Sequence, residues 1–226
     1  HGQDEEDKIM LNTVIFDMDG VLLDSEAIYL ESLRQCLLSV TGRDLPIPKL
    51  SQVIGMSMTD ITEKLIQEYD IHMSVRALIE LQNEYFDRVM ADTELKEIDG
   101  LTDFLQYLKE RGYKIGLASS SELAWIKEVL YNLGVTEYFD LLVSGETFEH
   151  SKPDPEIYNY AVDHLEAKKY ETIVIEDSRN GVMAAKNAGL KVVAFKGASI
   201  KQETDGADYT VHSYREMKTL FDEIGE

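Results

Sequence analysis

Short apolar runs that each end in a polar residue recur along this chain. Four of them, each with its terminating residue, are Val14–Phe16 before Asp17, Ile115–Ala118 before Ser119, Leu141–Val143 before Ser144, and Ile173–Ile175 before Glu176. Runs of this kind are typical of strands that are buried on both faces of a parallel sheet. Because parallel strands end at the same edge of a sheet, where open α/β sheets bind ligands, we expect the terminating residues to converge.

Amphipathic helical patterns lie between these runs. Apolar residues recur with helical spacing from Leu101 to Leu108 and from Ile126 to Leu133, and a glycine follows each stretch. Asp154 and Pro155 predict the start of a further helix, and Lys191–Phe195 reads as one more buried strand. The alternation of strand and helix predicts an α/β fold with a doubly wound parallel sheet, a Rossmann-like core.

Residues 25–95 break this alternation. They contain three helical stripes, at 30–40, 61–69 and 75–89, with no strand-like run between them. We therefore predict an all-α helical-bundle cap at 25–95, inserted into an α/β catalytic core of residues 10–24 and 96–226 and lying over the carboxyl ends of its strands. Residues 1–9 are acidic and lack apolar periodicity, and we expect a disordered or tag-derived arm there.

The charge balance narrows the classes of partner. With 22 Lys and Arg against 43 Asp and Glu, the formal net charge is −21, which repels phosphate backbones and anionic lipid headgroups. Neither nucleic acid nor a membrane is an expected partner, and no run approaches the ~20 apolar residues of a membrane span. The single cysteine, Cys36, and the absence of a signal-peptide pattern predict a cytoplasmic protein.

Carboxylates dominate the expected ligand-binding edge. Asp17 and Asp19 follow one strand and Glu176 and Asp177 another, and charges this close cannot all ionise without a cation. Oxygen ligands of this type suit Mg²⁺, which fills its remaining positions with water and substrate phosphate. Together with a hydroxyl and a lysine from other strand ends, this set is typical of phosphoryl transfer.

The chain resembles the haloacid dehalogenase superfamily of phosphohydrolases, in the subgroup with a helical cap after the first strand, and within it the sugar-phosphatase and β-phosphoglucomutase branch. The resemblance runs from about Thr13 to Leu220. Its four motifs occur in order: Asp17-Met18-Asp19-Gly20-Val21, Leu117-Ala118-Ser119, Ser151-Lys152-Pro153-Asp154, and Ile175-Glu176-Asp177-Ser178. The first motif alone is weak, whereas four at predicted strand ends are specific.

The resemblance implies catalytic roles for two aspartates. Asp17 is the expected nucleophile, which takes the phosphoryl group as an aspartyl phosphate. Asp19 is the expected acid and base, which protonates the leaving alkoxide and then deprotonates the attacking water. The Mg²⁺ cofactor is expected at Asp17, the Asp19 carbonyl and Asp177, with Glu176 as a direct or water-mediated ligand.

A second group of residues is expected to bind the substrate. The expected phosphate-binding residues are Ser119, Ser120, Lys152 and the backbone N–H of Gly20, where a missing Cβ permits close approach. In the cap, the resemblance implies that a loop containing Gly55 and Met58 dips into the site. Ser57 and Asp60 also fit a capping box for the following helix, a purely structural role. An aspartate that follows a strand can likewise have a structural role alone, as the N-cap of the next helix.

These residues predict a Mg²⁺-dependent phosphatase acting on a small phosphorylated metabolite, a sugar or polyol phosphate, as a monomer or weak dimer. The alternative is a sugar phosphomutase, but three polar groups of the mutases are replaced, by Met58, by Tyr29 and by Leu81 or Gln82. A third hypothesis is a catalytically silent binding protein, against which the intact Asp17 and Asp19 argue.

Overall fold

The computed structural model describes residues 10–54 and 56–225, in two compact units. One unit comprises the chain up to Asp24 and from Leu95 onward, and the other is Ser25–Glu94. The second unit holds only helices and turns among its described residues, in the stretch for which an all-α insertion was predicted. The predicted arm at 1–9 lies outside the described residues, and so does Gly55.

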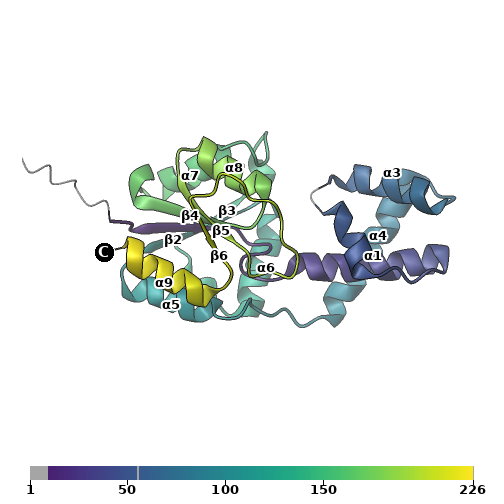
Figure 1. Ribbon diagram of the computed structural model, residues 1–226, viewed down its shortest axis with the longest axis horizontal. Helices are drawn as coiled ribbons and strands as arrows, with labels where there is room; N and C mark the ends of the chain where they lie inside the picture. The colour runs from purple at the N-terminus through teal and green to yellow at the C-terminus, as the bar shows by residue number, and fades with distance from the viewer. Residues whose placement is uncertain (1–9, 55, 226) are drawn as a thin grey trace, which may run out of the picture. The chain divides into compact units, whose positions relative to one another are not determined.

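The first unit is built on a parallel sheet of six strands in the order β3-β2-β1-β4-β5-β6 (Figure 1). The strands are β1 Thr13–Phe16, β2 Lys114–Ser119, β3 Leu141–Ser144, β4 Thr172–Glu176, β5 Lys191–Phe195 and β6 Tyr209–Val211. The first five are the predicted apolar runs. The sixth was not predicted, because its three residues include the exposed Thr210 and are too short to show a pattern.

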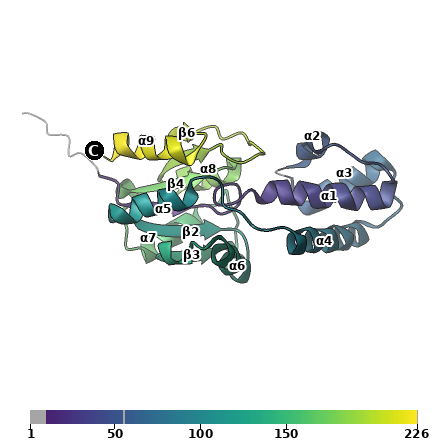
Figure 2. The same ribbon diagram turned by 90° about the horizontal axis from the view of Figure 1, so that it is seen from below.

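Helices cover both faces of the sheet, which confirms the predicted doubly wound α/β fold (Figure 2). α5, α6 and α9 pack on the face that receives Val14 and Phe16, whereas α7 and α8 pack on the face that receives Ile15. The helices are α5 Leu101–Glu110, α6 Leu123–Leu133, α7 Glu156–His164, α8 Arg179–Asn187 and α9 Tyr214–Ile224. Short 3₁₀ turns occur at Thr136–Tyr138, Gly145–Thr147 and Lys169–Glu171.

The second unit consists of α1 Ser25–Thr41, α2 Ile47–Leu50, a 3₁₀ turn at Ser51–Val53, α3 Met58–Tyr69 and α4 Val75–Asp92. α4 packs against both α1 and α3. Buried Gln82 of α4 donates a hydrogen bond from Nε2 to Thr62 Oγ1 of α3, at 2.9 Å. The predicted cap of α3 is present, since Ser57 Oγ accepts a hydrogen bond from the Asp60 N–H.

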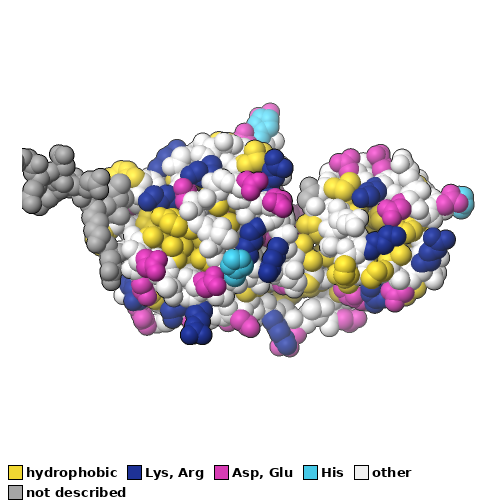
Figure 3. Space-filling model, viewed as in Figure 1, with side chains coloured by type: hydrophobic (Ala, Val, Ile, Leu, Met, Phe, Trp, Pro, Cys, Tyr) yellow, Lys and Arg dark blue, Asp and Glu magenta, His cyan; other side chains and the backbone are white. Residues whose placement is uncertain are grey.

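The visible surface carries both signs of charge. Figure 3 shows acidic and basic side chains interspersed on this face rather than separated into one acidic and one basic region. Within residues 10–54 and 56–225, no helix is both long enough and apolar enough to cross a membrane.

Candidate active site

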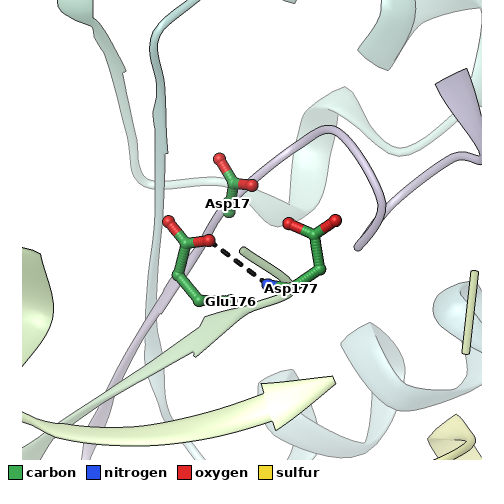
Figure 4. Close-up of side chains that lie close together, drawn as sticks. All are labelled: Asp17, Glu176 and Asp177. Carbon is green, nitrogen blue, oxygen red and sulfur yellow. Dashed lines mark hydrogen bonds between the residues drawn. The ribbon is translucent and has the colours of Figure 1, made fainter. Parts of the chain in front are cut away.

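The strand register brings Asp17 and Glu176 to the same edge of the sheet. Phe16 is paired with Ile175 of β4, and the Asp17 N–H donates to the Ile175 carbonyl at 2.9 Å. Asp17 and Glu176 each follow one residue later. Figure 4 shows their carboxylates converging with that of Asp177. The predicted convergence of carboxylates from two strands is therefore present in the fold.

The three carboxylates form a buried cluster. One oxygen from each of Asp17, Glu176 and Asp177 lies within 4.8 Å of the others, and Glu176 is fully inaccessible to solvent. Buried like charges at this spacing require positive charge beside them. An all-oxygen donor set of this kind fits a hard divalent cation such as Mg²⁺.

Lys152 supplies one positive charge to the cluster. Its Nζ donates to Glu176 Oε1 at 2.6 Å, to Asp17 Oδ1 at 3.0 Å and to the Ala118 carbonyl at 3.1 Å, which uses all three ammonium donors. Burial alone would lower the pKa of Lys152, but the adjacent Asp17 and Glu176 carboxylates outweigh it and hold that pKa well above its usual value. Lys152 is therefore a fixed cation in contact with the expected nucleophile.

One ammonium does not fully compensate the cluster. Burial, followed by the charge of Glu176, raises the pKa of Asp17 to about 7, although Lys152 acts in the opposite direction. Without a further cation, a substantial fraction of Asp17 is protonated near neutral pH. A divalent cation beside Asp17 favours the ionised form, which is the nucleophilic one.

The serines at the end of β2 are placed differently from one another. Ser119 is fully buried, and its Oγ accepts the Ser121 N–H at 3.1 Å, which leaves the hydroxyl proton for another acceptor. Ser120 is exposed. Ser121, which was not predicted, places its Oγ 3.4 Å from Asp19 Oδ2.

Gly20 is required for a reason other than the predicted one. Its N–H donates to the Leu23 carbonyl at 2.9 Å, so the expectation that this group binds phosphate does not match the loop. The residue has φ +75°, and a Cβ there would lie 1.9 Å from Asp177 Oδ2. A glycine at position 20 therefore lets the loop after β1 approach the carboxylate of Asp177.

The predicted cap-loop residues belong to the helical unit. Met58 is the first residue of α3 and is 36% exposed. Its contact with substrate stays a prediction, and Gly55 lies outside the described residues.

Comparison with known proteins places this geometry in a family. A family model for haloacid dehalogenase-like hydrolases matches residues 14–195. The chain belongs to this family. The predicted family, and with it the prediction of a hydrolytic enzyme, is thereby confirmed.

Individual haloacid dehalogenase-like relatives span most of the chain. A phosphorylated carbohydrates phosphatase of Thermotoga maritima is 33% identical over 181 residues, 80% of this chain and 83% of that protein. The pyrophosphatase PpaX of Bacillus mycoides is 27% identical over 184 residues, 81% of this chain and 83% of that protein. Among solved structures, a Thermotoga maritima protein assigned provisionally as a β-phosphoglucomutase has a TM-score of 0.79 at 30% identity, covering 94% of this chain and 99% of that one.

Two residues that hold this haloacid dehalogenase-like site together were not predicted. Tyr158 of α7 donates from its hydroxyl to Glu176 Oε1 at 2.5 Å. Gly181 of α8 lies so close to Glu176 that an added Cβ would be 1.9 Å from the carboxylate carbon. Only Gly181 had a signal in the sequence, because a glycine inside a helix often marks a close approach. The burial of Tyr158, which makes a partner for its hydroxyl necessary, is visible only in the structure.

Replacing Gly181 tests this close approach. Alanine favours a helix over glycine by roughly 1 kcal/mol, so a Gly181→Ala protein without the collision would be more stable than the wild type. Here the new methyl group must displace a fully buried carboxylate that accepts hydrogen bonds from Lys152 and Tyr158. We expect a net destabilisation of about 1–3 kcal/mol in denaturant unfolding. Asn180→Ala, at an exposed position in the same turn, is the control and should leave stability nearly unchanged; a stabilised Gly181→Ala protein would contradict the packing described.

The raised pKa of Asp17 predicts how stability changes with pH in metal-free protein. Between the ordinary aspartate pKa of 3.8 and about 7, the folded state holds a proton on Asp17 that the unfolded state has lost. The contribution of Asp17 to stability in EDTA should therefore fall as pH rises through this window, because the unfolded state binds fewer protons at this group. Asp17→Asn should remove this slope and raise the melting temperature at pH 8 by roughly 5 °C.

The control for this experiment is the exposed Asp103→Asn, which should keep the wild-type slope. Adding Mg²⁺ should stabilise the wild type more than Asp17→Asn. An Asp17→Asn protein whose stability in EDTA follows the same pH slope as the wild type between pH 4 and 7 would disprove the assignment.

Proposed function

We propose that this protein is a Mg²⁺-dependent phosphatase that hydrolyses a small phosphomonoester, a sugar or polyol phosphate, through a phosphorylated Asp17. The observation that carries the proposal is the lysine shared between Asp17 and Glu176 inside the buried carboxylate cluster. The Thermotoga maritima relative, named as a phosphatase of phosphorylated carbohydrates, supports the substrate class.

In the first half of the reaction, an oxygen of Asp17 attacks the substrate phosphorus and the bond from phosphorus to the alkoxide oxygen breaks. Asp19 donates a proton to that oxygen, so the alcohol leaves neutral. Lys152 already contacts Asp17 Oδ1, so its ammonium is placed to stabilise the negative charge that develops on the phosphoryl oxygens. The Ser119 hydroxyl is a further donor to these oxygens.

In the second half, water attacks the phosphorus and the bond to Asp17 breaks. Asp19, now ionised, takes a proton from the water, which restores both carboxyl groups and releases inorganic phosphate. Ser121 is close enough to Asp19 to restrict its orientation. The residues that would hold Mg²⁺ are Asp17, Asp177 and the Asp19 carbonyl, with Glu176 directly or through water, and the ion would neutralise charge on the transferring group.

The location, oligomeric state and partners of the protein form the rest of the proposal. We propose a cytoplasmic enzyme that is a monomer or weak dimer and acts on a phosphorylated metabolite rather than on nucleic acid or a membrane. The net charge of −21 supports the last of these points, because a strongly negative protein is repelled by nucleic acid and by anionic membrane surfaces.

A sugar phosphomutase is the second candidate, because the 30% identical structure from Thermotoga maritima carries that provisional assignment. The helical unit argues against it. Gln82 is buried and donates to Thr62, so its amide is engaged inside the unit, and Met58 offers no charge for a second phosphate.

Substituting the expected nucleophile tests the phosphatase proposal. Asp17→Asn keeps the shape of the side chain but removes its nucleophilic oxygen, so the rate of p-nitrophenyl phosphate hydrolysis should fall about 1,000-fold or more. Chelation of Mg²⁺ should abolish wild-type activity as well. Acid quenching during turnover followed by borohydride reduction should convert Asp17 to homoserine, detectable by peptide mass spectrometry. Asp103→Asn is the control, and near wild-type turnover by Asp17→Asn would refute the mechanism.

A second assay separates the phosphatase from the mutase. Given β-glucose 1-phosphate and catalytic glucose 1,6-bisphosphate, the protein should release inorganic phosphate faster than it forms glucose 6-phosphate. The physical reason is that a mutase must hold a bisphosphate while it reorients, and Met58 and the buried Gln82 provide no charge for that. Phosphate and glucose 6-phosphate are measured in the same reaction. Formation of glucose 6-phosphate in excess over free phosphate would favour the mutase.

A further inference from the structure

Glu176 is the most heavily engaged carboxylate of the cluster. Its Oε1 accepts both Lys152 Nζ at 2.6 Å and the Tyr158 hydroxyl at 2.5 Å. Its Oε2 accepts the Asp177 N–H at 3.2 Å and lies 3.4 Å from Ser178 Oγ. A fully buried side chain with this many donors is fixed in one orientation.

Tyr158 contacts both Glu176 and Lys152. It is fully buried in the core cluster on the α7 and α8 face of the sheet, and Lys152 Nζ lies 4.9 Å from the centre of its ring. Burial, followed by the charge of Glu176, holds the pKa of the Tyr158 hydroxyl well above its usual value, so the group is a proton donor. The catalytic steps described above do not use it.

We propose that Tyr158 is a positioning residue that holds Glu176 as the anchor of Lys152, and so keeps the ammonium on Asp17. The proposal rests on the proposed phosphatase function. A lysine side chain has four rotatable bonds and is not fixed by its own packing. Tyr158 fixes Glu176 Oε1, this oxygen fixes Nζ, and Nζ reaches Asp17 Oδ1 at 3.0 Å.

The role is a matter of geometry rather than of binding substrate. Without the Tyr158 hydroxyl, Glu176 Oε1 loses one of its two donors, and its carboxylate and the ammonium are free to shift together. Phosphoryl transfer depends on placement of the charged groups, so a small shift lowers the rate of the chemical step. Substrate affinity and metal affinity should change little, because Asp17, Asp177 and Ser119 stay in place.

Tyr158→Phe tests this directly, since phenylalanine keeps the ring and removes one oxygen. With p-nitrophenyl phosphate at saturating Mg²⁺, kcat should fall about tenfold while KM changes less than about twofold. The matched control is Tyr107→Phe, which also loses a hydroxyl that donates to a carboxylate, here to Asp222 at 2.6 Å, and which should keep wild-type kcat. In a Lys152→Ala background, Tyr158→Phe should change kcat less than about twofold, because the residue through which it acts is gone.

Mn²⁺ binding without substrate, followed by electron paramagnetic resonance, gives a readout that does not depend on turnover. Tyr158→Phe should bind Mn²⁺ within about threefold of the wild type, whereas Asp177→Asn should weaken binding more than about tenfold. If Tyr158→Phe does not fold, Glu176→Gln keeps the proposal testable: its neutral amide should hold the Lys152 ammonium less firmly, so kcat at saturating Mg²⁺ should fall while KM changes less than about twofold.

Three results would overturn the proposal: a Tyr158→Phe kcat equal to that of Tyr107→Phe, an undiminished tenfold effect in the Lys152→Ala background, or a loss of Mn²⁺ in Tyr158→Phe as large as in Asp177→Asn. A wild-type protein that hydrolyses no phosphomonoester would instead refute the proposed function. The two failures are therefore distinguishable.

Discussion

Repulsion between buried carboxylates is the constraint on which the rest of this site depends. Asp17, Glu176 and Asp177 are driven together by the register of β1 and β4, and a single ammonium lies among them. Two of these carboxylates, those of Asp17 and Glu176, have compensating neighbours. Lys152 bridges two of them, and Tyr158 adds a donor to the most buried one. The remaining negative charge is what a divalent cation would neutralise.

The same constraint explains the glycines around the cluster. Gly20 and Gly181 come from different segments, yet each stands where a Cβ would overlap a carboxylate, of Asp177 and Glu176 respectively. One glycine lies in a loop at φ +75° and the other in the first turn of α8. In both places the carboxylate occupies the space that a side chain on the glycine would fill, so it is buried directly against the main chain.

Strands and helices were predictable from the sequence where their apolar pattern is continuous or repeats at regular spacing. The strands at 14–16, 115–118 and 173–175 were predictable because each is a continuous apolar run, and the site edge followed from the polar residues that end them. The helices of residues 25–94 were predictable from their stripes, except α2, whose four residues are too few for a period to show.

Features that depend on three-dimensional packing were not predictable in this way. The hydroxyl of Tyr158 meets Glu176 only because α7 packs on the sheet over β2 and β3, and on a helical stripe the residue looks like ordinary core. The N–H of Gly20 was assigned to phosphate because a glycine beside an aspartate suggests close approach of a ligand, but the tight loop uses that group for the Leu23 carbonyl. Sequence spacing identifies which groups converge, and not which hydrogen bonds they form.

The position of the helical unit in the chain has a chemical consequence. It is inserted between β1, which the expected nucleophile Asp17 directly follows, and β2, which ends at Ser119. Its sequence can therefore change without altering the register that assembles the carboxylates. Phosphoryl transfer needs the same charges whatever alcohol departs, whereas recognition of that alcohol needs side chains that differ among substrates. The electrostatics of the buried cluster therefore restrict it to one geometry, whereas no such restriction acts on the sequence of the insertion.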